Sequence, residues 1–171
     1  MRPPSLSSRA HTTQLNDGVL AIDTEYLRPL QDASHLIIEG GRAAFVDTGA
    51  NDAVPLLLDA LQQQDLDAGD VDYVFLTHIH LDHAGGAGLL MQHLPNARCV
   101  VHPRGAPHMV DPERLIAGTI AVYGEERMRA MYGDIVPIEE SRVVVADDAA
   151  RFELDGRAMQ TLHTEGHARH H

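Results

Sequence analysis

Two kinds of hydrophobic pattern alternate along the chain. Short apolar runs that predict strands lie at residues 18–23, 36–38, 43–46, 71–76, 97–101, 142–145, 151–154 and 157–162. Apolar residues at helical spacing predict helices that begin after residues 51–52, cover residues 84–94, and extend from Asp111 as far as Met131. Gly40-Gly41 and Asp155-Gly156 are typical of tight hairpins. Strands that alternate with helices, with hairpins near both ends, predict a layered α/β domain with mixed sheets.

Composition and charge indicate an ordinary globular protein with one domain over residues 1–171. The chain is 44% hydrophobic and 22% charged, and its length leaves room for one core. Its net charge of −12 repels phosphate groups, so we expect neither nucleic acid nor a membrane as a partner. Residues 1–18 lack the apolar core of a signal peptide, and the single Cys99 lies in an apolar run. We therefore expect a cytoplasmic protein with a buried structural thiol.

A cluster of ionisable residues follows the predicted strand at residues 71–76. The six residues 78–83 contain three of the twelve histidines and one aspartate. Side chains two residues apart in an extended segment point the same way, so His78 and His80 can present two imidazoles to one cation. Asp82 and His83 come where the chain turns, and they can face a second cation beside the first. The cluster predicts a metal site.

Further candidate residues lie outside this cluster. A cation held by two histidines needs at least one more protein ligand, together with one open position for catalysis. The C-terminal segment offers four histidines: His163, His167, His170 and His171. We expect His170 and His171 to fray or to lie behind the ligands, because terminal residues are usually mobile. Asp47 either stabilises a turn or supports a ligand histidine. His102 and His108 are interpreted as structural residues that border the site.

Taken together, these motifs resemble the metallo-β-lactamase superfamily of metal-dependent hydrolases. The resemblance rests on residues 78–86, on Val46-Asp47-Thr48-Gly49, and on residues 163–167, which are similar to the His-Thr-Pro-Gly-His of that superfamily with Glu165 in place of proline. It implies an αββα sandwich with mixed sheets, of which this chain holds the N-terminal portion. The superfamily supplies a bridging aspartate and a further histidine from beyond the third motif. The rest of a longer chain, or a second copy in a homo-oligomer, is then expected to complete the fold.

The resemblance also implies roles for individual residues. His78, His80 and His167 correspond to ligands of the first metal site, and Asp82 and His83 belong to the second. The position of Asp47 implies that it supports a ligand histidine. The cofactor is then one or two Zn²⁺, and the second site is incomplete within this chain.

The activity implied by the resemblance is hydrolysis of a small-molecule ester, lactone, thioester or amide. Water held between two cations would lose a proton near neutral pH, and Asp82 would serve as the catalytic residue that orients the resulting nucleophile. Similar proteins of this fold hold one iron through two histidines and an acidic residue. The first alternative is therefore a persulfide or thiol dioxygenase with iron on His78, His167 and Asp82. The second alternative is a metal-binding fragment or pseudoenzyme without activity.

Overall fold

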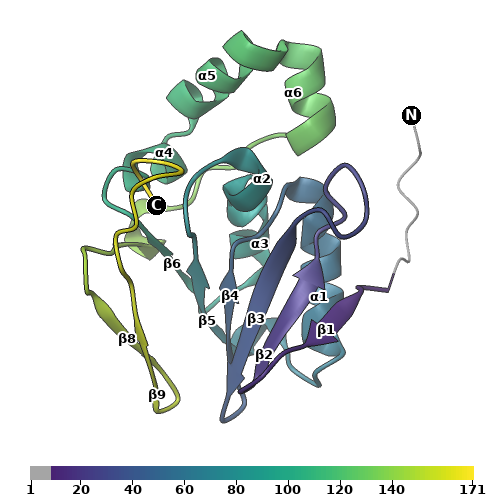
Figure 1. Ribbon diagram of the computed structural model, residues 1–171, viewed down its shortest axis with the longest axis vertical. Helices are drawn as coiled ribbons and strands as arrows, with labels where there is room; N and C mark the ends of the chain where they lie inside the picture. Colours follow the sequence, from purple (N-terminus) through teal and green to yellow (C-terminus); the bar gives the residue numbers. More distant parts are fainter. Residues whose placement is uncertain (1–8) are drawn as a thin grey trace.

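Within residues 9–171, which the computed structural model describes, a mixed sheet of seven strands forms the centre of the protein (Figure 1). Residues 1–8, part of the segment that we searched for a signal peptide, lie outside the described residues. Pairing is antiparallel from β1 to β4 and parallel from β4 to β7. The strands lie in chain order as β1 Thr12–Gln14, β2 Val19–Asp23, β3 Ala33–Glu39, β4 Arg42–Val46, β5 Val71–Phe75, β6 Arg98–Val101 and β7 Val143–Val145.

Helices connect the parallel strands. The α-helices are α1 Val54–Gln62, α2 Leu81–Ala84, α3 Ala87–His93, α4 Ala106–Val110, α5 Glu113–Tyr123 and α6 Glu125–Tyr132. Short 3₁₀ turns lie at Asn51–Ala53, Ala68–Asp70 and Glu140–Arg142. The helix predicted at 84–94 is present as α3, which begins at Ala87, whereas α2 overlaps the predicted range only at Ala84 and was not predicted. The stretch predicted from Asp111 to Met131 is interrupted at Gly124, whose φ of +81° ends α5, and the short helix α4 was not predicted.

The main core lies between the sheet and helices α1 and α3. Phe45 of β4 and Val74 of β5 are fully buried in one cluster with Leu57 of α1 and Leu90 of α3. Cys99 of β6 belongs to the same cluster and is fully buried, as predicted. Because successive side chains of a strand point to opposite faces, the neighbours of these residues point to the other side of the sheet.

A hairpin of β8 Arg151–Leu154 and β9 Arg157–Gln160 covers part of that other side. Its tight turn at 155–156 is the predicted one. The Phe152 ring meets the rings of Tyr73 and Phe75 edge to face, at centroid distances of 5.7 and 5.2 Å. Helices, the mixed sheet and this small second sheet therefore form three successive layers of the described residues. The layering confirms the predicted α/β architecture with mixed sheets.

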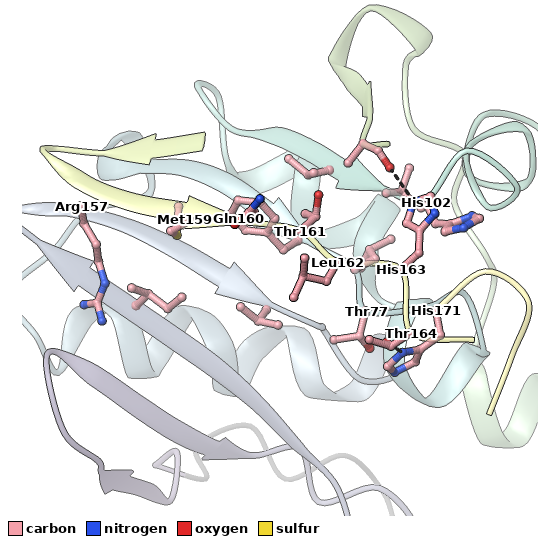
Figure 2. Close-up of a pocket in the computed structure, with 17 residues that line it drawn as sticks. Thr77, His102, Arg157, Met159, Gln160, Thr161, Leu162, His163, Thr164 and His171 are labelled. Carbon is pink, nitrogen blue, oxygen red and sulfur yellow. Dashed lines mark hydrogen bonds between the residues drawn. The ribbon is translucent and has the colours of Figure 1, made fainter. Parts of the chain in front are cut away.

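An open groove of about 540 Å³ lies between the hairpin and the mixed sheet. Its walls are mostly apolar and include Ile37, Val46 and Phe75. Figure 2 shows Arg157 at one end of this groove and His163 and His171 at the other. The groove therefore ends at the edge of the sheet where the predicted metal-binding residues follow the strands.

In the described part of the chain, every helix is too short or too polar to cross a membrane.

Candidate metal centre

Polar side chains gather where the parallel strands β4, β5 and β6 end. Asp47 follows β4, Thr77 and His78 follow β5, and His102 follows β6. The carboxyl ends of parallel strands lie at one edge of a sheet, which is the usual place for a ligand site in an open α/β sheet. Motifs that are 30 or more residues apart in the sequence are thereby brought together at this edge.

The Asp47 carboxylate anchors two parts of the histidine cluster. Its Oδ1 accepts the backbone N–H of Thr77 at 2.8 Å, and its Oδ2 accepts the Thr77 hydroxyl at 2.7 Å. The same Oδ2 lies 3.0 Å from His83 Nδ1. Asp47 itself has a φ of +58°, a left-handed conformation that Asp adopts more readily than most residues. Of the two roles that the sequence allowed, Asp47 thus has the one that supports a histidine.

The backbone of the two motifs is also joined directly. The N–H and the hydroxyl of Thr48 both donate to the carbonyl of His83, at 2.7 and 3.0 Å. Gly86 N–H donates to the carbonyl of Gly49 at 2.8 Å. A Cβ on Gly86 would lie 2.9 Å from the carbonyl oxygen of Ala50, closer than real Cβ atoms approach. Glycine at position 86 therefore permits the close passage of the two loops.

The hydrogen bonds of Thr77 determine which nitrogen of His78 can bind a cation. The one hydroxyl proton of Thr77 goes to Asp47, so its oxygen accepts from His78 Nδ1, which lies 3.0 Å away. His78 Nδ1 then carries the proton, and Nε2 has a free lone pair. Within the described residues, His78 Nε2 is buried and has no hydrogen-bond partner. A buried acceptor without a partner is costly unless a ligand satisfies it.

The imidazoles of three residues, His78, His80 and His167, lie close together. The ring of His78 lies 4.7 Å from that of His80 and 4.8 Å from that of His167, measured between centroids. His80 Nδ1 and His167 Nε2 are 3.1 Å apart. One ligand nitrogen from each of the three residues lies within 4.8 Å of the others. The structure thus brings together His78 and His80, which the sequence pattern paired, and His167, which the family resemblance added to the first metal site.

Asp82 and His83 lie together in the first turn of α2, beside this triad. His83 Nε2 is 3.9 Å from Asp82 Oδ2, and the ring of His83 is 4.3 Å from that of His78. Because His83 Nδ1 is bonded to Asp47, its Nε2 is the nitrogen left for a cation. The Asp82 side chain is 37% exposed, so its carboxylate is open to water.

Burial and neighbouring charges shift the pKa values of these histidines in opposite directions. Burial, followed by the charges of His83 and His80, lowers the pKa of His78 to about 4. Burial also lowers the pKa of His80, with a further contribution from His167. The hydrogen bond to Asp47 raises the pKa of His83. In the protein without metal, His78 is therefore neutral at pH 7 and its lone pair is available.

The donor set suits zinc. Zinc in proteins is bound by imidazole nitrogens in tetrahedral sites, and a catalytic site has three protein ligands and one open position. The His78–His80–His167 triad supplies three imidazoles, and among the described residues His78 Nε2 has no hydrogen bond that would compete with a cation. The second metal-capable cluster, Asp47, His78 and His83, uses a carboxylate that already holds Thr77 and His83.

The other candidate histidines surround the triad without joining it. His170 Nδ1 accepts the N–H of Ile79 at 3.4 Å, and His171 Nδ1 lies 2.6 Å from the hydroxyl of Thr164. Their ring centroids lie 6.2 and 5.3 Å from that of His78, so both residues are held beside the triad. His102 and His163 contact each other, with ring centroids 4.3 Å apart, and both line the groove. His108 lies in α4, outside both metal-capable clusters of the described residues.

Sequence reasoning did not identify Asp32 as a residue of the site. Its side chain is only 13% exposed, and its Oδ1 lies 4.0 Å from His83 Nδ1. Thr24 donates its hydroxyl to Asp32 Oδ2 at 2.9 Å, and burial raises the pKa of this carboxyl. Asp32 directly precedes β3 and lies in a segment without a motif, so no signal in the sequence pointed to it.

Comparison with known proteins agrees with this geometry. The family profile of the Metallo-beta-lactamase superfamily matches residues 27–171. A metallo-beta-lactamase fold-containing protein of Sulfurisphaera tokodaii is 29% identical over 105 residues, which are 59% of this chain and 39% of that protein. An N-acyl homoserine lactonase of Agrobacterium fabrum is 28% identical over 131 residues, which are 67% of this chain and 48% of the lactonase.

A solved structure extends the comparison to the fold. A mutant metallo-beta-lactamase of Cronobacter sakazakii superposes with a TM-score of 0.69 at 21% identity, over 94% of this chain and 56% of that one. The chain thus spans less than half the length of these two curated relatives and 56% of the solved structure. The profile match, the layered fold and the position of the histidine cluster agree, and the chain belongs to the metallo-beta-lactamase superfamily.

Proposed function

We propose that this chain carries the metal-binding part of a zinc-dependent hydrolase that cleaves an ester, lactone, thioester or amide bond in a small molecule. His78, His80 and His167 are the proposed ligands of the first zinc ion. Asp82 and His83 are the proposed ligands of a second. We also propose that residues 1–171 belong to one domain, because the β8–β9 hairpin packs on the central sheet through Phe152.

The observation that carries this proposal is the convergence of three imidazoles, one of which, that of His78, has a buried nitrogen without a hydrogen-bond partner. In the described part of the protein, His78 Nε2 has no hydrogen bond. One ring nitrogen from each of His78, His80 and His167 lies within 4.8 Å of the other two. Histidines that merely end a strand at the surface would turn their polar atoms to water instead. A cation shared by the three rings satisfies all of them at once.

Bound zinc supplies Lewis-acid polarisation of the scissile carbonyl and lowers the pKa of water, so that it becomes a nucleophile at neutral pH. The residues of the chain prepare the site for this chemistry. Asp47 and Thr77 fix the tautomer and the orientation of His78, and Asp47 also orients His83. The exposed carboxylate of Asp82 can accept a hydrogen bond from a water molecule at the mouth of the site. No nucleophilic side chain is needed.

The dioxygenase alternative has less support. It needs His78, His167 and Asp82 around one iron ion. Among the described residues, the metal-capable clusters with ligand atoms within 4.8 Å do not include Asp82. The all-histidine triad is therefore the arrangement that the geometry favours. Three imidazole ligands are typical of zinc, whereas two histidines and one carboxylate are typical of iron in oxygenases.

The test is the metal content and the activity of purified protein. We expect the wild-type chain to retain zinc through gel filtration, and His78→Ala or His80→Ala to lose it, since each removes one of three ligands. His93→Ala, which removes an exposed histidine at the end of α3, is the matched control and should retain zinc. The rates at which the zinc-loaded protein hydrolyses ester, lactone, thioester and amide substrates are then compared.

Two results would contradict the proposal. Undiminished zinc in His78→Ala would show that the ion lies elsewhere. Purification with iron, together with oxygen consumption in the presence of a thiol or persulfide, would favour the dioxygenase.

A further inference from the structure

The segment that carries His167 has no regular secondary structure. Residues 161–171 follow β9 without forming a strand or a helix, whereas His78 and His80 lie between β5 and α2. The side chains of His80 and His167 are both exposed. A ligand on such a segment loses conformational freedom when it binds a cation, unless other contacts already hold the segment in place.

One turn provides such contacts. The residues that follow β6, from His102 to Gly105, lie against the segment at 163–169. The rings of His102 and His163 are 4.3 Å apart at an interplanar angle of 43°. Figure 2 shows these two side chains next to each other, away from the end of the groove where Arg157 lies. The backbone N–H of Arg104 donates to His102 Nδ1 at 3.0 Å, which fixes the orientation of the His102 ring.

Arg104 contacts the chain on both sides of His167. Its Nη1 lies 3.5 Å from Glu165 Oε1, and the same nitrogen donates to the carbonyl of Arg169 at 3.3 Å. Glu165 and Arg169 are each two residues away from His167 in the sequence. A planar guanidinium with five N–H donors can make both contacts together, which the single ammonium of lysine does less well.

The identity of residue 165 explains why side-chain contacts are needed to hold this turn. The motif at 163–167 has glutamate at the position where the sequence that it resembles has proline. Proline fixes its own φ and thereby restricts a turn without any side-chain partner. Glutamate leaves the backbone free, but its carboxylate reaches the Arg104 guanidinium from the turn after β6.

We propose that His102 and Arg104 form a clasp that holds His167 in position for zinc. They are positioning residues, because neither reaches the His78–His80–His167 triad itself. The clasp rests on the proposed function in that it assumes His167 to be a zinc ligand. Preorganisation of the segment at 163–169 then adds to the zinc affinity.

The test is a zinc titration of the metal-free full chain, measured by calorimetry or by competition with a chelator of known affinity. Arg104→Ala should weaken zinc binding about fivefold, because an exposed ion pair and one hydrogen bond to a carbonyl are modest interactions. Arg104→Lys should retain part of the affinity. In a double-mutant cycle, Glu165→Gln should have little further effect once Arg104 is alanine.

Arg129→Ala is the matched control. Arg129 also forms an exposed ion pair with a glutamate, Glu125, and the exposed fractions of the two side chains, 59% and 65%, match those of Arg104 and Glu165, 57% and 62%. Its zinc affinity should stay within about twofold of the wild-type value, as is usual for a surface pair. Thermal melts of all metal-free variants should coincide, because Arg104 is exposed and its loss leaves the core intact.

A spectroscopic signature separates a positioning role from a general loss of stability. In cobalt-substituted protein, the visible absorption of Arg104→Ala should change in shape or intensity at saturating cobalt, which a purely structural change elsewhere would not cause. Equal zinc affinity of Arg104→Ala and wild type, combined with loss of zinc in His80→Ala, would overturn the clasp and leave the proposed function intact. Failure of the wild-type chain to bind zinc would overturn both.

Discussion

Asp47 illustrates how much of this site depends on one carboxylate. Its two oxygens accept from the backbone and hydroxyl of Thr77 and contact His83 Nδ1. Through Thr77 it also sets the tautomer of His78. One buried aspartate therefore directs a free nitrogen of two different imidazoles toward the same region. Such outer partners commonly matter for metal affinity nearly as much as the ligands themselves.

One residue-scale prediction concerns Cys99, the single cysteine of the chain. Its side chain is fully buried in the main core, and burial raises the pKa of the thiol to about 12. Because the thiolate is the reactive form, native protein at pH 8 should react with a thiol reagent only as fast as the core opens. We expect labelling over hours in buffer and within minutes in guanidinium chloride. Fast labelling of the native protein would contradict the observed packing of β6.

The sequence pattern for His78 and His80, and the family resemblance for His167, indicated three histidines that the structure brings together, and Asp47 beside them, but not all of the surrounding residues. Histidines two apart after a buried strand carry a local signal, and His80 indeed points to the same region as His78. Asp32 and Arg104 carry no such signal. Their partners are distant in the sequence. A lone aspartate or arginine in a loop looks the same in the sequence whether its side chain faces water or a functional site.

At the scale of elements, the β8–β9 hairpin connects the central sheet to the third motif. It packs through Phe152 on two aromatic residues of β5, and His163 follows β9 after two further residues. The same strand β5 leads into His78. Strand β5 therefore leads directly into His78 and also supports the hairpin that precedes the segment with His167.

Phe152→Ala tests the importance of this contact. A fully buried phenylalanine costs about 3–5 kcal/mol when it is replaced by alanine, and Phe152 is only partly buried, so we expect a loss of about 2 kcal/mol. For a chain of this size, the melting temperature should fall by about 4–8 °C. Val145→Ala, at a position that is 54% exposed on β7, is the control and should melt within about 1 °C of wild type. Equal melting of both variants would show that the hairpin adds little to stability.

Strands were predicted more reliably than the ends of helices. Apolar runs that lie in a sheet are bounded by turns, and both expected hairpins are present at 40–41 and 155–156. The helical pattern continues across Gly124, because a glycine inside such a pattern is compatible with a helix. In the structure Gly124 instead has a φ of +81° and separates α5 from α6. Similarly, the helix predicted from residue 84 begins only at Ala87, and Gly86 before it packs on Gly49 and Ala50, a contact between distant segments.

For the whole molecule, the number of ligands determines the expected metal content. His78, His80 and His167 converge in one cluster. Asp82 and His83 form a pair, and a cation bound to them would have two protein ligands where about three or more are usual. The first site should therefore bind zinc tightly, and the second should be weak in this chain alone. Hydrolysis of activated esters by the chain alone should accordingly be slow.

Calorimetric titration of the metal-free protein with zinc tests this expectation. We expect one tight equivalent per chain. Zinc should also raise the melting temperature, because a ligand at about 100 times its Kd stabilises the folded state by about 2.7 kcal/mol when the unfolded chain does not bind it. Unfolded histidines bind zinc weakly, so the measured gain should be somewhat smaller. Two tight equivalents would mean that His163, His170, His171 or a second copy of the chain completes the site of Asp82 and His83.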